Sequence, residues 1–336
     1  MPPNSNTTAT ELAPCSPSDT QEVKSASGRP YKYKGTEIKW VNTIAITLFH
    51  LVGFATALPA LYYSKFPTVL FTLLLGWFGG FGVTAGVHRL WTHRAYKAKL
   101  PLRIFLLIAF ATSGQNSIYD WVRDHRVHHR YSETDADPHN VKRGFFFAHV
   151  GWLMLHKHPE VIRRGNTMDM SDILADPVAR FHEKFFIPMK IVFCFLIPIC
   201  TPVYVWNESW TWSVLSLGVL RYMLNLNFTW FVNSAAHMWG NKPFDKRMAP
   251  VENRAVAVVA MGEGWHNYHH VFPWDYKAAE LGDYAFNFTT FGIDQFAKIG
   301  WAYDLKKASP SMIKRVAEKY GDGSHPHYEA PPPDGN

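Results

Sequence analysis

Residues 68–93 read TVLFTLLLGWFGGFGVTAGVHRLWTH, an apolar run that ends directly before two histidines. A helix needs about 20 apolar residues to cross the hydrocarbon core of a bilayer. Residues 68–87 meet that length, so we predict a membrane-spanning helix that ends at His88. Since neutral imidazole is the commonest side-chain metal ligand, the stretch indicates a membrane protein with a metal site at the edge of the bilayer.

Three further segments can accompany this helix across the membrane. Residues 41–63 precede it across the short link SKFP, and residues 185–206 and 212–235 form a second pair across the link NESWT. Residues 100–111 are apolar but too short to span, so we expect a helix at the membrane surface. We therefore predict an all-α membrane protein with four transmembrane helices in two hairpins and a helical cap.

The distribution of basic residues predicts how the protein is oriented in the membrane. The chain of 336 residues has a formal charge of +7, and its basic residues lie mostly just outside the apolar segments. By the positive-inside rule this places the cap, the histidines and both termini in the cytosol. No nucleic-acid motif is interleaved with these residues, so nucleic acid is not an expected partner, whereas membrane lipid is.

The ends of the chain differ from its middle in composition. Residues 1–38 are polar and rich in Ser, Thr and Pro, so we predict a disordered cytosolic tail. Residues 39–307 form one predicted domain, and residues 308–336 a C-terminal cytosolic tail in which His325 and His327 are solvent-exposed. The chain has three cysteines and no CxxC, which argues against disulfides and thiolate metal sites.

Three histidine clusters dominate the chemistry of the chain. HRLWTH (88–93), HRVHH (125–129) and HNYHH (266–270) supply eight of the 17 histidines, and His237 is a ninth candidate. Positions i, i+3 and i+4 share one helix face, so each of the last two clusters is expected to aim three ring nitrogens at one point. The i, i+5 spacing of the first cluster fits a helix that ends or bends between its histidines.

The residue types limit the metal. Soft-metal sites would need cysteine, and Ca²⁺ or Mg²⁺ sites would need carboxylates, so all-imidazole coordination indicates Fe, Zn, Cu or Ni. A structural zinc ion needs only four ligands. Nine histidines therefore predict two metals with about four or five ligands each and open positions for oxygen.

These motifs resemble those of the membrane-bound acyl-CoA desaturases, the stearoyl-CoA desaturase family. The likeness covers roughly residues 39–307 and includes DWVRDH (120–125), ETDADPH (133–139), NSAAH (233–237) and GEGWH (262–266). It is greatest to insect members, with phrases similar to the moth pheromone-gland Δ11 branch. The resemblance implies O₂-dependent insertion of a Δ11 or Δ9 double bond into a saturated or monounsaturated fatty acyl-CoA, for unsaturated fatty acid or pheromone-precursor biosynthesis, in the endoplasmic reticulum membrane.

The resemblance also assigns residues. It implies two iron ions held by His88, His93, His125, His128, His129, His237, His266, His269 and His270, with Asn233 reaching one iron through water. It implies contacts to the CoA head from Asn42, Asn116, Arg123, Asp124 and Lys157, and a bend in the acyl tunnel at Gln115, Trp121, Thr229 and Trp230. Electrons would come from cytochrome b5 and its NADH-dependent reductase.

Two features of this predicted site allow more than one interpretation. Candidates to orient the ligand imidazoles are the carboxylates Asp124, Asp135, Asp137 and Glu263. The alternative for each is a loop carboxylate that caps the main chain. The glycines of residues 68–87, Gly76 and Gly80 among them, either let helices pack closely or leave room for the methyl end of the acyl chain.

Other functions are also compatible with such a chain. The same scaffold could give hydroxylation or a conjugated diene. A histidine-rich membrane metal transporter is the alternative from another class, but it would carry its ligands in mid-span.

Overall fold

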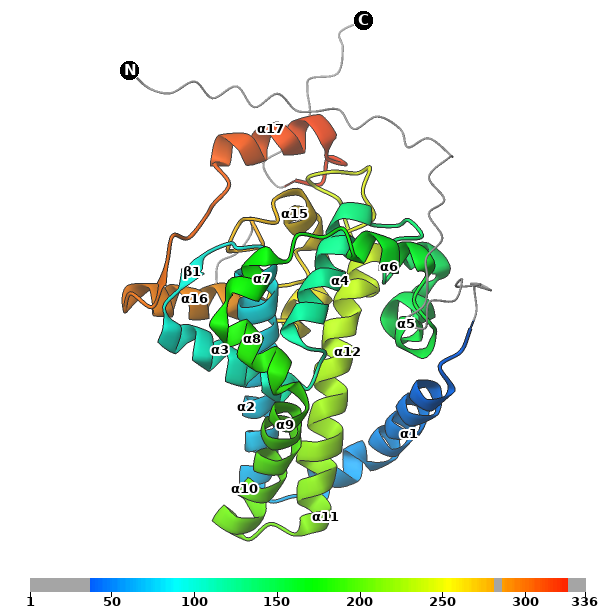
Figure 1. Cartoon of the computed structure of the whole chain (residues 1–336), viewed down its shortest axis with the longest axis vertical. Coiled ribbons are helices and arrows are strands. Elements are labelled where there is room, and N and C mark those ends of the chain that lie inside the picture. The colour runs from blue at the N-terminus through cyan, green and yellow to red at the C-terminus, as the bar shows by residue number, and fades with distance from the viewer. Residues whose placement is uncertain (1–36, 281–285, 326–336) are drawn as a thin grey trace, which may run out of the picture.

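The computed structural model describes residues 37–280 and 286–325. Long helices stand below a cap of shorter ones (Figure 1), so the predicted, mostly helical architecture is confirmed. Within the described residues the exception is a small antiparallel pair, β1 (Lys97–Ala98) and β2 (Ala302–Tyr303). The predicted N-terminal tail lies, up to residue 36, outside the described residues.

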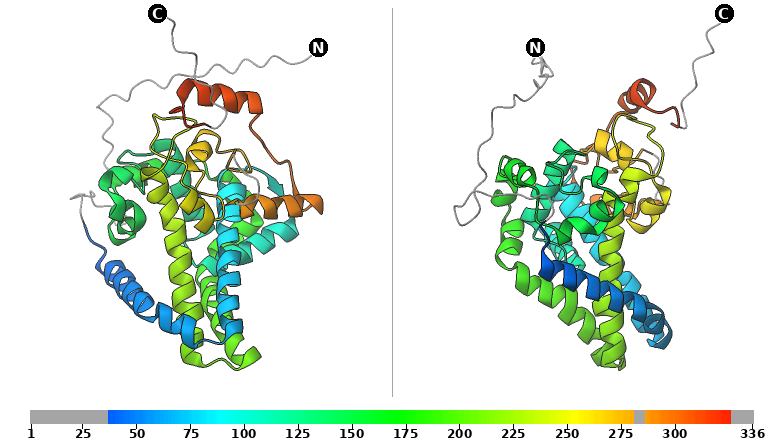
Figure 2. Two further views of the ribbon diagram at one scale, coloured as in Figure 1. Left: turned by 180° about the vertical axis from the view of Figure 1, so that it is seen from behind. Right: turned by 90° about the vertical axis from the view of Figure 1, so that its right-hand side faces the viewer.

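Three helical segments of the described chain are long and apolar enough to cross a membrane: Trp40–Tyr63, Phe66–Thr92 and Phe186–Trp206. The fourth predicted segment is also helical, but it is not one of these three and it contains Arg221 and Asn225. Figure 2 shows that the first helix crosses the others obliquely. The elements are α1 (Trp40–Tyr63), α2 (Phe66–Phe81), η1 (Gly82–Thr92), α9 (Phe186–Met189), η4 (Lys190–Leu196), α10 (Ile197–Trp206), α11 (Trp210–Ser213), η5 (Val214–Leu220) and α12 (Arg221–Asn233).

The cap is built from the segments that follow the second and the fourth of these helical stretches. Its first helix, α3 (Leu100–Ser113), crosses the bundle and packs against α2 and η1. The remaining cap elements are α4 (Ile118–Tyr131), η2 (Val141–Arg143), η3 (Phe147–Gly151), α5 (Trp152–Met154), α6 (Pro159–Gly165), α7 (Ser171–Ala175), α8 (Pro177–Lys184), α13 (Ala235–Met238), α14 (Arg254–Val259), α15 (His266–Val271), α16 (Phe288–Lys298) and α17 (Pro310–Tyr320).

The glycines of the second helical segment divide between the two predicted uses. A Cβ atom on Gly82 would lie 2.1 Å from the main-chain nitrogen of Phe110, so this glycine permits the close crossing of η1 and α3. A Cβ atom on Gly79 would lie 2.6 Å from Nδ2 of Asn225. By contrast, a Cβ atom on Gly76 would meet nothing closer than 3.9 Å. Close packing therefore explains Gly79 and Gly82, and open space remains beside Gly76.

A buried arginine joins the helices around this crossing. Arg221 is 1% exposed, and its guanidinium donates hydrogen bonds to the carbonyl oxygens of Thr112 and Cys194 at 2.7 and 2.5 Å. Thr112 lies in the last turn of α3, where main-chain carbonyls lack helical partners and carry partial negative charge. Arg221 thus pins α3 and η4 to α12 by satisfying carbonyls that would otherwise be unpaired.

Part of the expected C-terminal tail is packed on the cap. Ile313 and Ala317 of α17 are buried in a cluster with Phe244, Tyr268 and Phe272. His325, which we expected to be exposed, is 6% exposed, and its Nε2 lies 2.6 Å from Oε2 of Glu280. That expectation is wrong, because His325 pairs with the carboxylate of Glu280 and its ring packs against Phe244. Local sequence does not reveal these contacts. His327 lies outside the described residues.

Candidate metal centre

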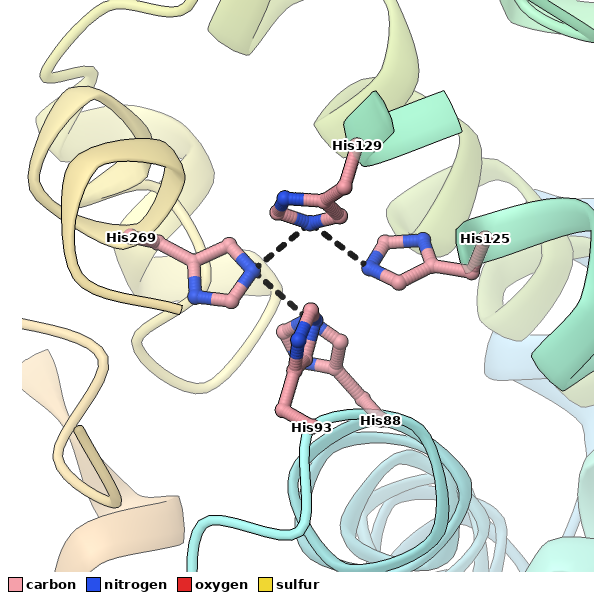
Figure 3. A group of neighbouring side chains, drawn as sticks. All are labelled: His88, His93, His125, His129 and His269. Atoms are coloured by element: carbon pink, nitrogen blue, oxygen red, sulfur yellow. Dashed lines mark hydrogen bonds between the residues drawn. The ribbon is translucent and has the colours of Figure 1, made fainter. Parts of the chain in front are cut away.

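All nine histidines singled out in the sequence meet inside the cap. They form two groups. Within each group, one ring nitrogen of every histidine lies within 4.8 Å of those of the others. Figure 3 shows the first group, in which rings from η1, α4 and α15 point their nitrogens into one space. This five-membered group comprises His88, His93, His125, His129 and His269, and the four-membered group comprises His128, His237, His266 and His270.

Each HxxHH cluster is divided between the two groups. His125 and His129 enter the first group while His128 enters the second, and His266 and His270 enter the second while His269 enters the first. The expectation that each cluster aims at one point is therefore wrong. At about 100° per residue, positions i and i+4 differ by about 40°, whereas i+3 lies about 60° to the other side of i. In each motif the first and last histidines therefore point to a metal site on one side of the helix, and the middle histidine points to the site on the other side.

The i, i+5 spacing of the first cluster follows from a widened helix. The main-chain N–H of His93 donates to the carbonyl of His88 at 3.1 Å, and the Thr92 hydroxyl donates to the carbonyl of Val87 at 2.7 Å. Such i to i+5 bonds define π-helix, which occurs often at functional sites. Residues five apart then lie on one face, and both histidines reach one group. Because η1 ends at Thr92 and His93 is the capping residue, the predicted end of the helix between the two histidines is confirmed.

Three carboxylates hold the outer nitrogens of ligand rings. Nδ1 of His88 lies 2.8 Å from Glu263, Nδ1 of His128 lies 2.8 Å from Asp137, and Nδ1 of His237 lies 3.2 Å from Glu133. Such contacts set the tautomer and direct Nε2 inward.

The expected carboxylates Asp137 and Glu263 are thus among the three, whereas Asp124 and Asp135 are not. Asp135 is exposed, and Asp124 pairs with Lys157 and Arg123. Glu133 was missed because its partner, His237, is 104 residues away in the chain.

Charge around the rings keeps two of these carboxylates ionised. Burial raises the pKa of a carboxyl group, but Arg89 and His88 together lower the pKa of Glu263 to about 2. Arg89 is 1% exposed and donates to Glu263 from both Nε and Nη2. Burial also opposes the charged form of Asp137, but the charge and hydrogen bond of His128 lower the pKa of that carboxyl. Glu263 and Asp137 are therefore anionic at neutral pH, whereas burial raises the pKa of Glu133.

The inner nitrogens cannot all be satisfied by protons. Nε2 of His269 lies 3.0 Å from Nε2 of His88 and 3.1 Å from Nε2 of His129. A neutral His88 with its proton on Nδ1, the nitrogen that lies 2.8 Å from Glu263, has only a lone pair at Nε2. One proton on His269 could serve only one of the two neighbours. Burial, followed by the neighbouring histidines, lowers the pKa of His125, His129 and His269 well below the usual value, so the rings are neutral.

The second group has the same arrangement. His237 directs Nδ1 to Glu133, so its Nε2 is a lone pair, and it lies 3.0 Å from Nε2 of His266. Nε2 of His266 is also 3.1 Å from Nε2 of His270. Buried imidazoles with converging lone pairs fit cations, and two groups fit two of them.

Two cavities meet beside the first group. One, of about 120 Å³, is lined mainly by apolar side chains of α2 and α12 and includes both Gly76 and Gly80. The other, of about 520 Å³, is a more polar cleft lined by Asn42, Asn116 and Asp124. The residues that line both are Trp121, His125, Thr229 and Asn233. A long ligand could therefore have a polar head in the cleft and an apolar tail in the cavity.

A chain of hydrogen bonds shapes this junction. The amide of Gln115 donates to Oγ1 of Thr229 at 2.9 Å and accepts from Nε1 of Trp121 at 2.9 Å. Gln115 thereby ties the loop after α3 to α4 and α12. Trp230 lines the cleft on its other side and stacks on His50.

Three of the residues predicted for the polar head, Asn42, Asn116 and Asp124, line the cleft. Asp124 accepts from Nζ of Lys157 at 2.5 Å and from Nη2 of Arg123 at 3.0 Å, which places both predicted cations beside it. Arg123 also lies 2.9 Å from Oδ1 of Asp120, so the two cations of this cluster are balanced by two carboxylates.

Comparison with known proteins agrees with this geometry. The family model described as fatty acid desaturase matches residues 64–281. An acyl-CoA Delta-9 desaturase of Acheta domesticus is 54% identical, over 88% of this chain and 82% of that protein. An acyl-CoA Delta(11) desaturase of Spodoptera littoralis is 52% identical, over 86% and 85%. A (11Z)-hexadec-11-enoyl-CoA conjugase of Bombyx mori is 46% identical, over 97% and 98%. The chain is therefore a member of the fatty acid desaturase family.

Proposed function

We propose that this protein is an O₂-dependent acyl-CoA desaturase that inserts a double bond at the Δ9 or Δ11 position of a fatty acyl chain. The observation that carries the proposal is the junction of the polar cleft and the apolar cavity at His125, a member of the first histidine group. Relatives at about half identity are named as Δ9 and Δ11 desaturases, which supports the same reaction here.

Two iron ions would occupy the two histidine groups, five imidazoles around one and four around the other. Bound iron supplies the activation of O₂ needed to remove hydrogen from an unactivated methylene pair. The residues of the chain hold the ligand rings neutral, orient them through Glu133, Asp137 and Glu263, and keep water from the buried site. Asn233, on the wall shared by both cavities, would reach one iron through water.

The acyl-CoA would lie across both cavities. Lys157 and Arg123 would bind the anionic CoA head, and the tail would bend at Trp121 and run along α12. Fixing both ends of the chain places one methylene pair beside His125, since proximity and orientation decide which bond reacts.

The reaction needs electrons from outside the chain. We propose cytochrome b5, reduced by its NADH-dependent reductase, as the donor, with the cap and both termini on the cytosolic side of the endoplasmic reticulum membrane. The segment Trp210–Asn233 would be the fourth span, because its polar Arg221 is buried against carbonyls. A basic chain of charge +7 favours an acidic donor.

A conjugated-diene activity is the second candidate. One relative at 46% identity is named as a conjugase. The same junction would serve it if the bound chain already carried a double bond. A metal transporter fits less well, because the histidine groups lie at the C-terminal end of the second helical segment and beyond it, and not in mid-span.

Expression in a desaturase-deficient yeast tests the proposal. Mapping the double bonds in its fatty acids should show new Δ9 or Δ11 products from saturated acyl donors. His128→Ala should abolish them, while His158→Ala, outside both histidine groups, should not. No new unsaturation with the donors supplied, at normal protein levels, would refute the proposed function.

A further inference from the structure

His139 is a buried histidine that belongs to neither metal group. It is 8% exposed and lines the polar cleft together with Asp124, His125 and Trp152. Its Nδ1 is fully buried, and neither ring nitrogen makes a hydrogen bond to the part of the chain that the structure describes. A buried polar side chain without a partner is rare and costs free energy comparable to a lost hydrogen bond.

The ring is held in place on both sides. The main-chain N–H of His139 donates to Oδ1 of Asp137 at 2.9 Å, the same oxygen that contacts Nδ1 of His128 at 2.8 Å. The ring packs edge-on against Trp152, with centroids 4.3 Å apart. The imidazole is therefore preorganised in the cleft, next to a metal-ligand ring, and is not a side chain that can turn to solvent.

The position of the His139 ring determines which part of a bound ligand it can contact. In the proposed function, which this inference deepens, the cleft holds the head of an acyl-CoA and the apolar cavity holds its tail. Between them lie the thioester carbonyl and the amides of the pantetheine arm, the last hydrogen-bonding groups before the hydrocarbon. A neutral imidazole offers one donor and one acceptor, so it can bond either group.

We propose that His139 hydrogen-bonds the thioester–pantetheine segment of acyl-CoA and so sets how far the tail enters the cavity. Because the methylene pair that reacts is counted from the thioester, an anchor at this point determines the position of the double bond. Asp137 links this anchor to His128, so one carboxylate positions both a metal ligand and the substrate contact.

Equilibrium binding to the full-length protein in lipid nanodiscs tests the proposal without catalysis. The probes are stearoyl-CoA and S-octadecyl-CoA, a thioether that lacks the thioester carbonyl. His139→Phe, which keeps an aromatic ring against Trp152, should weaken stearoyl-CoA binding about three- to tenfold, as loss of a neutral hydrogen bond predicts. His139→Asn, which can still donate and accept, should recover part of the affinity.

His182→Phe is the matched control. His182 is also buried, but it accepts from the main-chain N–H of Ile118 and does not line the cleft. Acyl-CoA affinity should be unchanged in this variant. In the yeast assay, His139→Phe should also spread the double bond over neighbouring positions, a change that mere loss of stability would not cause.

The outcomes separate the two carbonyl sources. Weakened binding of stearoyl-CoA alone assigns the contact to the thioester, and weakened binding of both probes assigns it to a pantetheine amide. Binding of stearoyl-CoA to His139→Phe as tightly as to the natural protein would overturn the inference and leave the proposed function intact. Failure of the natural protein to bind any acyl-CoA would refute both.

Discussion

Replacing Gly76 with phenylalanine should shorten the longest acyl chain that the protein accepts. The apolar cavity runs along α12 from Thr229, at its junction with the cleft, to Arg221, beside Gly76. These two residues are eight positions apart, which is about 12 Å at 1.5 Å per residue. A Cβ atom on Gly76 meets only Cγ of Arg221 at 3.9 Å, so the new ring can enter the cavity without displacing the backbone.

The size of the effect follows from the length that the ring removes. A phenyl group takes up about 5 Å, roughly one helical turn. An extended chain advances about 1.2 Å per bond, as the main chain does over its three bonds per residue, so about four methylene groups lose their place. At about 0.8 kcal/mol for each buried methylene, the longest substrates lose about 3 kcal/mol. Their kcat/KM should fall roughly a hundredfold or more, while chains about four carbons shorter keep theirs.

The assay is competition between saturated acyl-CoAs of graded length, with products separated by length and double-bond position. Gly86→Ala is the matched control, because its Cβ atom would lie 3.3 Å from the ring of Trp91 and Gly86 does not line the cavity. It should reduce activity equally for all lengths. A Gly76→Phe protein that folds and retains the natural length profile would refute the assignment of this cavity to the acyl tail.

Three further substitutions test the packing and charges around the site. Glu263→Gln should lower metal affinity about 10- to 100-fold, measured by chelator competition, because Nδ1 of His88 loses its anionic partner; unchanged affinity would contradict this. Burial raises the pKa of Glu252 to about 8, so the folded protein retains this proton longer than the unfolded chain, and stability falls as pH rises from about 4.5 to 8. Glu252→Gln, neutral throughout, should therefore raise the melting temperature near pH 8 but not near pH 5, and equal shifts at both would contradict it. Arg221→Met should cost about 2 kcal/mol or more in thermal unfolding, since two buried carbonyls lose their donors; an unchanged melting temperature would show that they are satisfied otherwise.

Local composition and short spacing were enough to predict the class of protein and most of its parts. The helical segments of the membrane region, the nine histidines and the family depend on runs of apolar residues and on motifs such as HRVHH, which are properties of neighbouring residues. Three of the residues expected to bind the CoA head also line one cleft, and the other two pair with Asp124 there, although their role stays a proposal.

Other features depend on where distant segments meet. A histidine motif specifies which rings can bind metal, but the division of His125 and His128 between two groups needs partners from η1 and α15. Likewise, the glycine-rich sequence does not show that Gly79 faces Asn225 whereas Gly76 faces open space.

The sequence by itself therefore determined the chemistry available to this protein: imidazoles at the end of an apolar helix, basic residues just outside the apolar segments and the membership of its family. Only the tertiary structure decided how that chemistry is arranged, including the pairing of His237 with Glu133 and the unpaired ring of His139 in the cleft. The physical reason is that residue type and helical period act over a few positions. Hydrogen-bond pairing and cavity shape, by contrast, arise from contacts between segments a hundred or more residues apart.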